Sequence, residues 1–482
     1  MTNAAPVLIL SIHVWVLNDF RAVCKGKLTM HIGIVTLGCD KNTVDTEYIA
    51  GLLASQGHEV FTPGMEDELD ALAVNTCGFI ESAKQESIDA ILLWVEEKKR
   101  RQEETGTSFY LYVIGCLVER YASELLEAIP EIDGLAGVGE WKRTARMILS
   151  SPDRKSVPVA VSPPGRLPDM KITRCMPRKK LDPEVYAFLK IADGCSHSCR
   201  FCAIPFIKGK RRSVPRKILL REAADLIRRG AREINLVAQD SSLYGTDLYQ
   251  KYRLTQLVRD IARLPGKFWI RVLYTYPATL SDDFIRLMRE EENLCPYLDV
   301  PLQHLSPEVL RRMGRPPDPT RILNRLNRWR KEIPELTIRT TFIVGFPGET
   351  RRDFEILLEG VRQFGFDRIG AFLYSPEEGT AAFDMDRVVS KRTARRRLDR
   401  LMRVQAGISL EKNRRLIGKV TSVLIEEEIP GEKIYLARSM ADAPEVDGLV
   451  IVRSDRKLPP GTFARCRIKD AGEYDLLGEL EG

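Results

Sequence analysis

The chain has 482 residues, of which 44% are hydrophobic and 29% charged, and its net charge is +7 with a pI near 8.8. This length exceeds one domain, and the composition is that of a globular protein, which excludes fibrous and low-complexity classes. Ten cysteines in so long a chain do not form a secreted disulfide framework. Clustered thiols instead indicate metal chemistry in a reducing compartment, so we predict a cytoplasmic protein. The basic residues are spread along the chain, which makes any nucleic-acid contact secondary.

The first 29 residues contain an apolar run, Val7–Leu17. It is short for a membrane span, which needs about 20 residues. It also lacks a basic start and a small-residue cleavage site, so it does not read as a secretory signal. Met30 directly precedes the first clean strand pattern. We therefore predict that 1–29 is a disordered extension, that the functional chain begins near Met30, and that the protein has no membrane partner.

An N-terminal domain is predicted over 30–150, where short apolar runs alternate with helical patterns. Strands alternating with helices indicate a parallel sheet covered on both faces, with its functional crevice outside the carboxyl ends of the strands. Cys39, Cys77 and Cys116 each follow one of these strands, so we expect three thiols to converge on one edge. Three unrelated buried cysteines are the alternative. The predicted strands are 32–37, 69–74 and 109–114, and the predicted helices are 43–56, 82–99 and 121–128.

Strand–helix alternation resumes over 181–410, after a proline-rich stretch at 151–180 that is predicted to be a linker. Six strand–helix units predict an open, partial (β/α)6 barrel. Barrel enzymes place their chemistry at the carboxyl ends of the strands, so residues just after each strand are the candidates for a site. The predicted strands are 188–192, 233–237, 269–274, 297–300, 337–344 and 369–374.

Three cysteines with CxxxCxxC spacing, Cys195, Cys199 and Cys202, follow the first of these strands. Thiolates at this spacing surround one metal centre and suit soft metals and iron–sulfur clusters. A closed site needs four ligands, and this loop supplies three, which leaves one iron of a 4Fe–4S cluster open to a substrate. The alternative is a zinc knuckle completed by a distant residue. His197 lies too close in sequence to form a separate tetrahedral arm, so we interpret it as a loop residue.

Other predicted strand ends carry polar residues or glycines that point to a ligand pocket on the same rim. Gln239, Asp240 and Ser241 follow the second strand, where they meet the amino or carboxylate end of a ligand. The turn Gly345–Glu349 follows the fifth, and Gly345 and Gly348 let backbone approach a flat ligand, with Glu349 beside them. His304 ends the fourth strand, and we favour a hydrogen-bonded loop histidine over an acid or base.

The last part of the chain changes to short alternating strands, after an amphipathic connecting helix over 386–416. Residues 411–482 therefore predict a small antiparallel β-barrel. This segment has 12 Lys and Arg against 14 Asp and Glu, a net charge of −2. An RNA-binding module is normally basic, so a basic protein is the better partner. The predicted strands are 419–426, 433–439, 448–453 and 463–470.

Taken in this order, the three-cysteine domain, the CxxxCxxC partial barrel and the terminal barrel resemble the radical S-adenosylmethionine (SAM) methylthiotransferases, and the last module is similar to a TRAM domain. One branch of that family, the MiaB type, modifies isopentenyl-adenosine in tRNA. The other, the RimO type, modifies an aspartate of ribosomal protein S-twelve. The segments 37–42, 75–80 and 296–304 are similar to the RimO type.

The resemblance implies two 4Fe–4S clusters, one on Cys195, Cys199 and Cys202 with SAM on its open iron, and an auxiliary one on Cys39, Cys77 and Cys116. One SAM would be the radical source and a second the methyl donor, acting on the β-carbon of the aspartate with an electron donor and a sulfur donor. The two sites would face each other across one cavity. A tRNA methylthiotransferase and a non-catalytic iron–sulfur ribosome-binding protein remain as alternatives. The implied SAM contacts are Phe201, Gln239, Asp240, Ser241, Gly345, Gly348 and Glu349.

Overall fold

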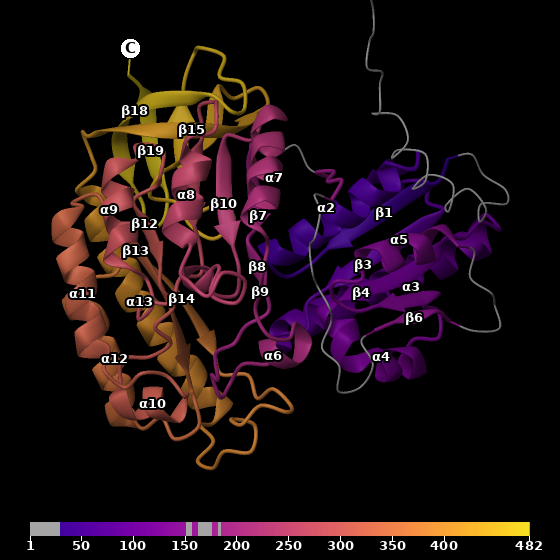
Figure 1. Cartoon of the computed structure of the whole chain (residues 1–482), viewed down its shortest axis with the longest axis horizontal. Helices are drawn as coiled ribbons and strands as arrows, with labels where there is room; N and C mark the ends of the chain where they lie inside the picture. Colours follow the sequence, from indigo (N-terminus) through magenta and orange to yellow (C-terminus); the bar gives the residue numbers. More distant parts are fainter. Residues whose placement is uncertain (1–28, 151–156, 162–175, 182–184, 482) are drawn as a thin grey trace, which may run out of the picture. The chain divides into compact units, whose positions relative to one another are not determined.

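The computed structural model describes residues 29–150, 157–161, 176–181 and 185–481 (Figure 1). Nearly all of the predicted extension 1–29 therefore lies outside the described residues, as does most of the predicted linker. The chain forms two compact units, one built mainly from residues up to 182 and the other mainly from residue 183 onward. In the part of the chain that the structure describes, no helix is both long and apolar enough to cross a bilayer.

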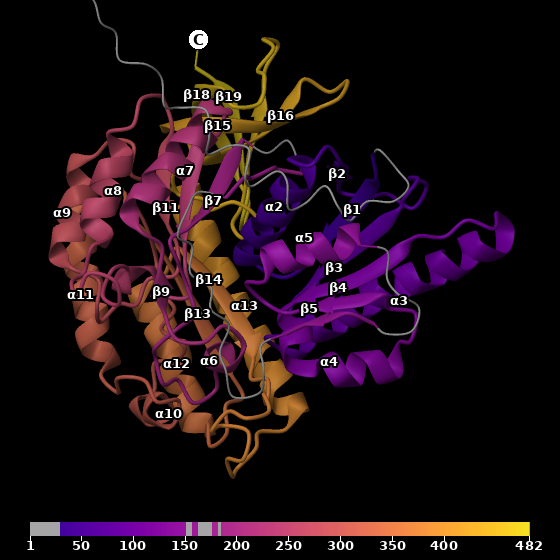
Figure 2. The ribbon, with the colours of Figure 1, turned by 45° about the vertical axis from the view of Figure 1, so that its right-hand side comes forward.

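The N-terminal unit is a six-stranded parallel sheet in the order β2-β1-β3-β4-β5-β6. Figure 2 shows α2 and α5 on one face and α4 on the other. The three strands expected from the sequence are present as β1, β3 and β4. Three shorter strands were not predicted, and β6 falls inside the expected linker. The bounds are β1 His31–Thr36, α2 Asp40–Ala54, β2 Glu59–Phe61, β3 Ala71–Thr76, α3 Glu81–Glu104, β4 Tyr110–Gly115, α4 Cys116–Ala128, β5 Gly134–Ala136, α5 Trp141–Leu149 and β6 Val159–Ala160.

The central strands of this sheet are buried on both faces, as their unbroken apolar runs require. Leu72 and Val74 of β3 point into one core, where Ile91 of α3 and Leu117 of α4 cover them. The opposite face is covered by α2 and α5, where the Tyr48 ring packs edge-on against Trp141. Covering both faces leaves the carboxyl-terminal edge of the sheet as the place where polar chemistry can occur.

The second unit begins with six parallel strands in chain order, arranged as the sheets β7-β10-β11 and β12-β13-β14. A bridge between Ile270 and Leu294 links the two sheets. Helices follow the strands on the outside, so the predicted partial (β/α)6 barrel is confirmed. The bounds are β7 Tyr186–Lys190, β8 Ala192–Asp193, α6 Ile204–Ile207, β9 Arg212–Ser213, α7 Arg216–Arg228, β10 Glu233–Val237, η1 Ser241–Leu243, α8 Leu254–Ala262, β11 Trp269–Val272, α9 Asp282–Glu290, β12 Tyr297–Asp299, α10 Pro307–Arg312, α11 Pro319–Glu332, β13 Thr337–Val344, α12 Arg351–Phe364 and β14 Arg368–Leu373.

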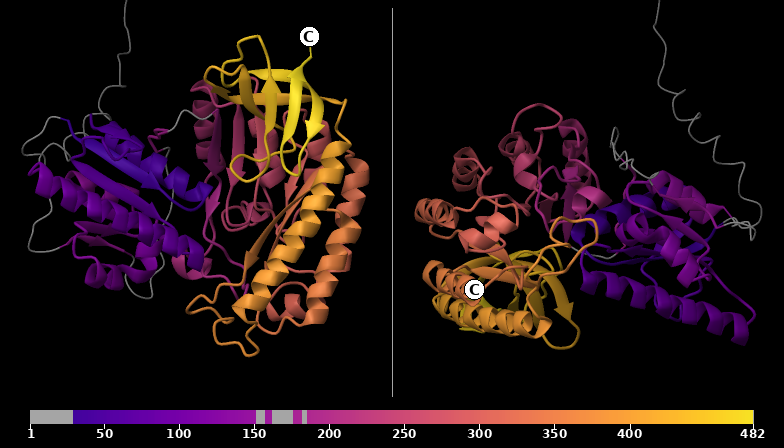
Figure 3. Two further views of the ribbon diagram at one scale, coloured as in Figure 1. Left: turned by 180° about the vertical axis from the view of Figure 1, so that it is seen from behind. Right: turned by 90° about the horizontal axis from the view of Figure 1, so that it is seen from below.

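A small closed barrel ends the chain, in the order β15-β16-β17-β19-β18. Figure 3 shows it at one end of the strand arc, with the long helix α13 running alongside the strands. The predicted barrel is thus confirmed, but it has a fifth strand, β19, that closes it by pairing with both β17 and β18. The bounds are α13 Lys391–Arg414, β15 Val420–Ile429, β16 Ile434–Ser439, β17 Val450–Arg453, β18 Phe463–Ala471 and β19 Leu476–Leu480.

Buried ion pairs join the small barrel to the partial barrel. Glu233, the first residue of β10, lies 2.7 Å from Arg271 of β11 and 2.7 Å from Arg438 of β16. Tyr297, the first residue of β12, donates to Asp447 at 2.5 Å, and these contacts lie near the amino-terminal ends of the strands. The small barrel therefore covers the amino-terminal end of the arc and leaves the carboxyl-terminal end open for chemistry.

Candidate functional site

The CxxxCxxC loop leaves the carboxyl end of the first barrel strand and is held by backbone hydrogen bonds at both ends. The Cys195 amide donates to Gly209 at 3.0 Å, and the Arg200 amide donates to Met313 at 3.0 Å. Gly194 has φ +72, and a Cβ there would meet the Lys210 carbonyl at 2.4 Å, so only glycine fits this turn into the loop. The loop is therefore positioned by the fold before any metal arrives.

The three thiols of this loop lie within electrostatic range of one another. Burial above all, with a smaller contribution from Cys199 and Cys195, raises the pKa of Cys202 to about 12, although the Ile204 backbone and the positive charge of Arg315 oppose the rise. Burial likewise raises the pKa of Cys195. A metal cation among the three sulfurs reverses this balance, because a coordinating thiol is deprotonated outright. Three converging sulfur donors on a preset loop fit a soft metal or an iron–sulfur cluster.

His197, inside the loop, is engaged by protein groups. Its Nε2 lies 2.6 Å from the Asp240 carboxylate, and its ring stacks on Tyr276 with centroids 4.4 Å apart. Arg315 lies over the same tyrosine ring at 4.7 Å. These contacts support the interpretation of His197 as a loop residue. They also tie the cysteine loop to the ends of β10 and β11.

Some buried polar atoms near Cys195 have no hydrogen bond among the described residues. Arg211 is 5% exposed, and none of its three guanidinium nitrogens has a hydrogen bond among the described residues. Its nearest carboxylate is Asp240, at 3.8 Å. Gln239 donates to Asp193 at 3.0 Å, but its Oε1 has no partner within the described ranges. Buried polar groups are nearly always satisfied, so this place fits a ligand with charged and hydrogen-bonding groups.

Ser241 is placed differently from the other two members of its predicted trio. Its hydroxyl donates to the Leu273 carbonyl at 2.6 Å, and the residue is fully buried in the barrel wall. Asp240 by contrast accepts from the Ser242 amide at 2.9 Å and from His197. The three residues therefore lie together at the end of β10, with Ser241 turned away from the unpartnered groups.

The turn Gly345–Glu349 follows β13 and leads into α12. Both glycines have positive φ, and a Cβ on Gly345 would lie 2.6 Å from Ala394 of α13. The space that these glycines free is thus occupied, at least in part, by this chain. Glu349 folds back to accept from the Phe346 amide at 3.2 Å and pairs with Arg397 at 3.0 Å. Its role in SAM contact stays a prediction.

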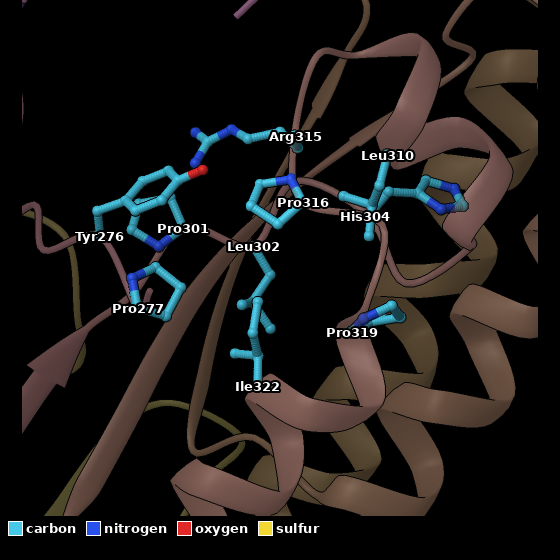
Figure 4. A pocket seen from close by; sticks show the side chains of 10 residues that line it. All are labelled: Tyr276, Pro277, Pro301, Leu302, His304, Leu310, Arg315, Pro316, Pro319 and Ile322. Atoms are coloured by element: carbon cyan, nitrogen blue, oxygen red, sulfur yellow. The ribbon is translucent and has the colours of Figure 1, made fainter. Parts of the chain in front are cut away.

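A hollow of about 290 Å³ of empty space opens near the same rim, lined mainly by prolines, aliphatic side chains and the Tyr276–Arg315 pair (Figure 4). Phe201 lies outside its lining and packs edge-on against Phe346 at 6.4 Å. His304 borders the hollow, but Figure 4 shows its ring directed away from it. His304 is fully buried and accepts from the Ser306 amide at 2.9 Å. Burial lowers its pKa to about 3, so it is a neutral loop residue at physiological pH.

The second set of cysteines lies at the carboxyl ends of three adjacent strands in the N-terminal unit. Cys39 caps α2 after β1, Cys77 follows β3, and Cys116 follows β4, and these strands neighbour one another in the sheet. A Cβ on Gly38 would lie 3.1 Å from the Cys77 sulfur, and one on Gly78 would lie 2.7 Å from the Cys116 carbonyl. The three strand ends that carry these cysteines are therefore neighbours at one edge of the sheet, and the convergence of the thiols themselves stays a prediction.

Both sets supply three thiols, and CxxxCxxC and the three strand ends offer no fourth among the described residues, which fits a 4Fe–4S cluster with one open iron. Within the described residues, no three Cys, His, Asp or Glu side chains already stand at the mutual spacing of a bound metal ion. The match to a 4Fe–4S cluster therefore depends on the presence of three thiols in each set and on their position after the strands.

Several residues of these sites were missed by the sequence reasoning. Arg211, Tyr276 and Arg315 approach the cysteine loop from other segments of the barrel. Asn42 lies beside the auxiliary cysteines. Arg211 is set apart from the other buried Lys and Arg of the described residues because none of its three guanidinium nitrogens has a hydrogen bond, and this is decided by tertiary packing. Asn42 did carry a signal, because it closes the LGCDKN segment that begins at Leu37.

Comparison with known proteins agrees with this architecture. Residues 189–360 match the radical SAM superfamily, 417–480 match the TRAM domain, and 31–137 match a family described as uncharacterized protein family UPF0004. A solved structure of the radical SAM methyltransferase TsrM from Kitasatospora setae, with cobalamin and a [4Fe-4S] cluster bound, is similar in fold. It shares 15% identity with a TM-score of 0.55, over 74% of this chain and 77% of that one.

Fold and site together define a radical SAM enzyme with a TRAM barrel, whose family uses SAM and 4Fe–4S clusters. The chain is 42% identical over 449 residues to the ribosomal protein uS12 methylthiotransferase RimO of Thermoanaerobacter sp. (strain X514), covering 93% of this chain and 99% of the relative. The RimO protein of Desulforudis audaxviator is 45% identical over 93% of this chain and 96% of its own length. The chain therefore belongs to the RimO family of radical SAM methylthiotransferases.

Proposed function

We propose that this protein attaches a methylthio group to the β-carbon of an aspartate in ribosomal protein uS12. The observation that carries the proposal is the presence of two separate three-thiol sites, each at the carboxyl ends of parallel strands, in a chain whose relatives are named uS12 methylthiotransferases. One site alone would suffice for SAM cleavage. A second is required if sulfur is also to be delivered.

In this proposal Cys195, Cys199 and Cys202 hold the cluster that binds SAM, and Cys39, Cys77 and Cys116 hold the auxiliary cluster. When bound, these clusters supply one-electron reduction of SAM and an iron site for sulfur, which protein side chains do not offer. The residues of this chain bind SAM and orient it. The Arg211 guanidinium and Gln239 Oε1, which have no hydrogen bonds among the described residues, would meet the charged end of SAM, and backbone hydrogen bonds hold the loop that carries the thiols.

The partners follow from the same proposal. The protein substrate is uS12, free or in the small ribosomal subunit, and the slightly acidic terminal barrel favours a basic protein over RNA. An electron donor and a sulfur donor are also required. A cytoplasmic location agrees with this substrate and with the free thiols of all eight described cysteines.

The test uses the reconstituted full-length protein with SAM, a chemical reductant and sulfide, offered either uS12 or tRNA. A mass gain of one methylthio group on an aspartate of uS12 supports the proposal. Thiomethylated tRNA with unmodified uS12 would favour the MiaB type instead, and the absence of 5′-deoxyadenosine would favour a non-catalytic role.

Two cysteine variants separate the roles of the sites. Replacing Cys39, Cys77 and Cys116 by alanine should preserve reductive SAM cleavage and abolish methylthiolation. Replacing Cys195, Cys199 and Cys202 by alanine should abolish both. Loss of SAM cleavage in the first variant, with iron still bound, would contradict this division.

A further inference from the structure

One side chain contacts all three strand ends that carry the N-terminal cysteines. Asn42 lies in the first turn of α2 and is 2% exposed. Its Nδ2 donates to the Leu37 carbonyl at 3.0 Å and to the Thr76 carbonyl at 3.1 Å. Leu37 follows β1 and lies two residues before Cys39, and Thr76 ends β3 directly before Cys77.

The third strand end is reached by the other side of the same amide. Asn42 Oδ1 lies 3.9 Å from the Cys116 sulfur, which follows β4 and donates its thiol proton to that oxygen. The backbone of Asn42 is held as well, because its carbonyl accepts from Asn75 Nδ2 at 3.0 Å. Two carbonyls on the Nδ2 side fix the orientation of the amide, since Oδ1 in that place would face two other acceptors.

We propose that Asn42 is a positioning residue of the auxiliary metal centre, setting the separation and direction of Cys39, Cys77 and Cys116. This inference rests on the proposed assignment of these cysteines to a cluster. A plain helix-to-sheet contact would bind one strand end, whereas this amide binds one carbonyl next to each of two cysteines and, in the metal-free protein, accepts from the thiol of the third. Removing a residue that orients a metal ligand without binding the metal itself commonly lowers the metal affinity about 10–100-fold.

The chain offers a matched control on the same helix. Thr46 is also buried, and its hydroxyl contacts Thr36 at 2.8 Å and accepts from Asn75 at 2.9 Å. Thr46→Val therefore removes two buried hydrogen bonds between α2 and the sheet without removing a contact to a cysteine or its neighbouring carbonyl. Asn42→Asp keeps the shape of the side chain, loses both donated hydrogen bonds and places a negative charge against Cys116. Asn42→Ala removes all three contacts without adding charge.

The experiment uses full-length protein in which Cys195, Cys199 and Cys202 are alanine, so that only the auxiliary cluster is counted. Iron per chain, the rate of iron loss to a chelator and the apo-protein unfolding midpoint are measured for Asn42→Asp, Asn42→Ala and Thr46→Val. We expect both Asn42 variants to lose iron about 10–100-fold faster than Thr46→Val. Asn42→Ala should do so at an apo midpoint similar to that of Thr46→Val, whereas Asn42→Asp should also lower the apo midpoint, because its buried oxygen faces two carbonyls. We also expect Asn42→Asp to have the lower reduction potential of the two, because of its added charge.

Equal rates of iron loss in the Asn42 and Thr46 variants would overturn the inference. So would an apo midpoint of Asn42→Ala far below that of Thr46→Val, which would assign the residue to the fold alone. If the three-alanine background itself retains no iron while wild type does, the proposed assignment of the auxiliary cysteines fails, and the inference falls with it.

Discussion

The buried glutamate at the base of the barrel provides a direct test of how the terminal barrel is attached. Glu233 has no exposed surface and accepts from Arg271 Nε at 2.7 Å, with Arg438 Nη2 2.7 Å away. Glu233→Gln keeps the volume but removes the charge that two buried guanidinium groups share. Arg438 retains Glu426 at 2.6 Å, and Arg271 retains the Met440 carbonyl at 2.8 Å, so neither arginine is left wholly without partners.

Removing one partner of a buried ion pair costs about 3–5 kcal/mol. The retained partners place this substitution at the lower end, about 3 kcal/mol. For a domain of 150–250 residues, each kcal/mol of lost stability lowers the unfolding midpoint by about 2–4 °C. The C-terminal unit is larger, so we take the lower limit of about 2 °C per kcal/mol. A loss of about 3 kcal/mol should then lower the midpoint by about 6 °C. The Cys195–Cys202 loop follows the carboxyl end of β7, whereas Glu233 begins β10, so the iron that this loop binds should stay unchanged.

The assay is thermal unfolding of the purified protein, followed by circular dichroism, with Glu426→Gln as the control. Glu426 contacts the same arginine, but its side chain is 18% exposed, so its loss should cost about 1 kcal/mol. An unfolding midpoint for Glu233→Gln within about 2 °C of wild type, or equal to that of the control, would refute the reasoning.

The same substitution predicts a pH dependence. Burial by itself raises the pKa of Glu233, but the charges of Arg271 and Arg438 outweigh burial and hold that pKa below its ordinary value. The stabilisation is therefore present above the pKa of the unfolded state and is lost as pH falls through the folded pKa. The gap in unfolding free energy between wild type and Glu233→Gln should narrow on acidification below the ordinary pKa of glutamate, and a gap that widens would contradict the sign.

Four further substitutions test single contacts. His197→Ala breaks a hydrogen bond to the buried Asp240 carboxylate, which is worth about 1.5–3 kcal/mol. In SAM-cleavage assays the KM for SAM should rise about 10-fold or more. An unchanged KM would exclude a role of His197 in positioning the loop. Gly51→Ala should release the segment around Pro177 and speed its cleavage by proteases, because the new Cβ would meet the Pro177 carbonyl at 2.3 Å; an unchanged digestion pattern would contradict this. Gln239→Ala should weaken SAM binding by calorimetry, while Ser241→Ala should lower stability and leave binding unchanged, since its hydroxyl bonds to backbone; the reverse order would contradict the placement.

Regular, strongly patterned segments were predictable from the sequence. The six barrel strands and the three main N-terminal strands were expected close to where they occur, because long apolar runs and helical periods are local signals. Strands β2, β5 and β6 were missed because two or three residues hold too little pattern, and they exist only through pairing with the sheet. Strand β19 was missed for a related reason, since its five residues become a strand by closing a barrel.

The same division applies to the chemistry. Cysteine spacing and position after strands are properties of the sequence, because parallel strands must bring their carboxyl ends to one edge, and they sufficed to group Cys39, Cys77 and Cys116. The burial of a side chain and its hydrogen-bond partners cannot be read from the sequence in this way, because they depend on which distant segments pack together. Only the tertiary structure could show that Arg211 is buried without a hydrogen-bond partner among the described residues, or that Asn42 joins three strand ends.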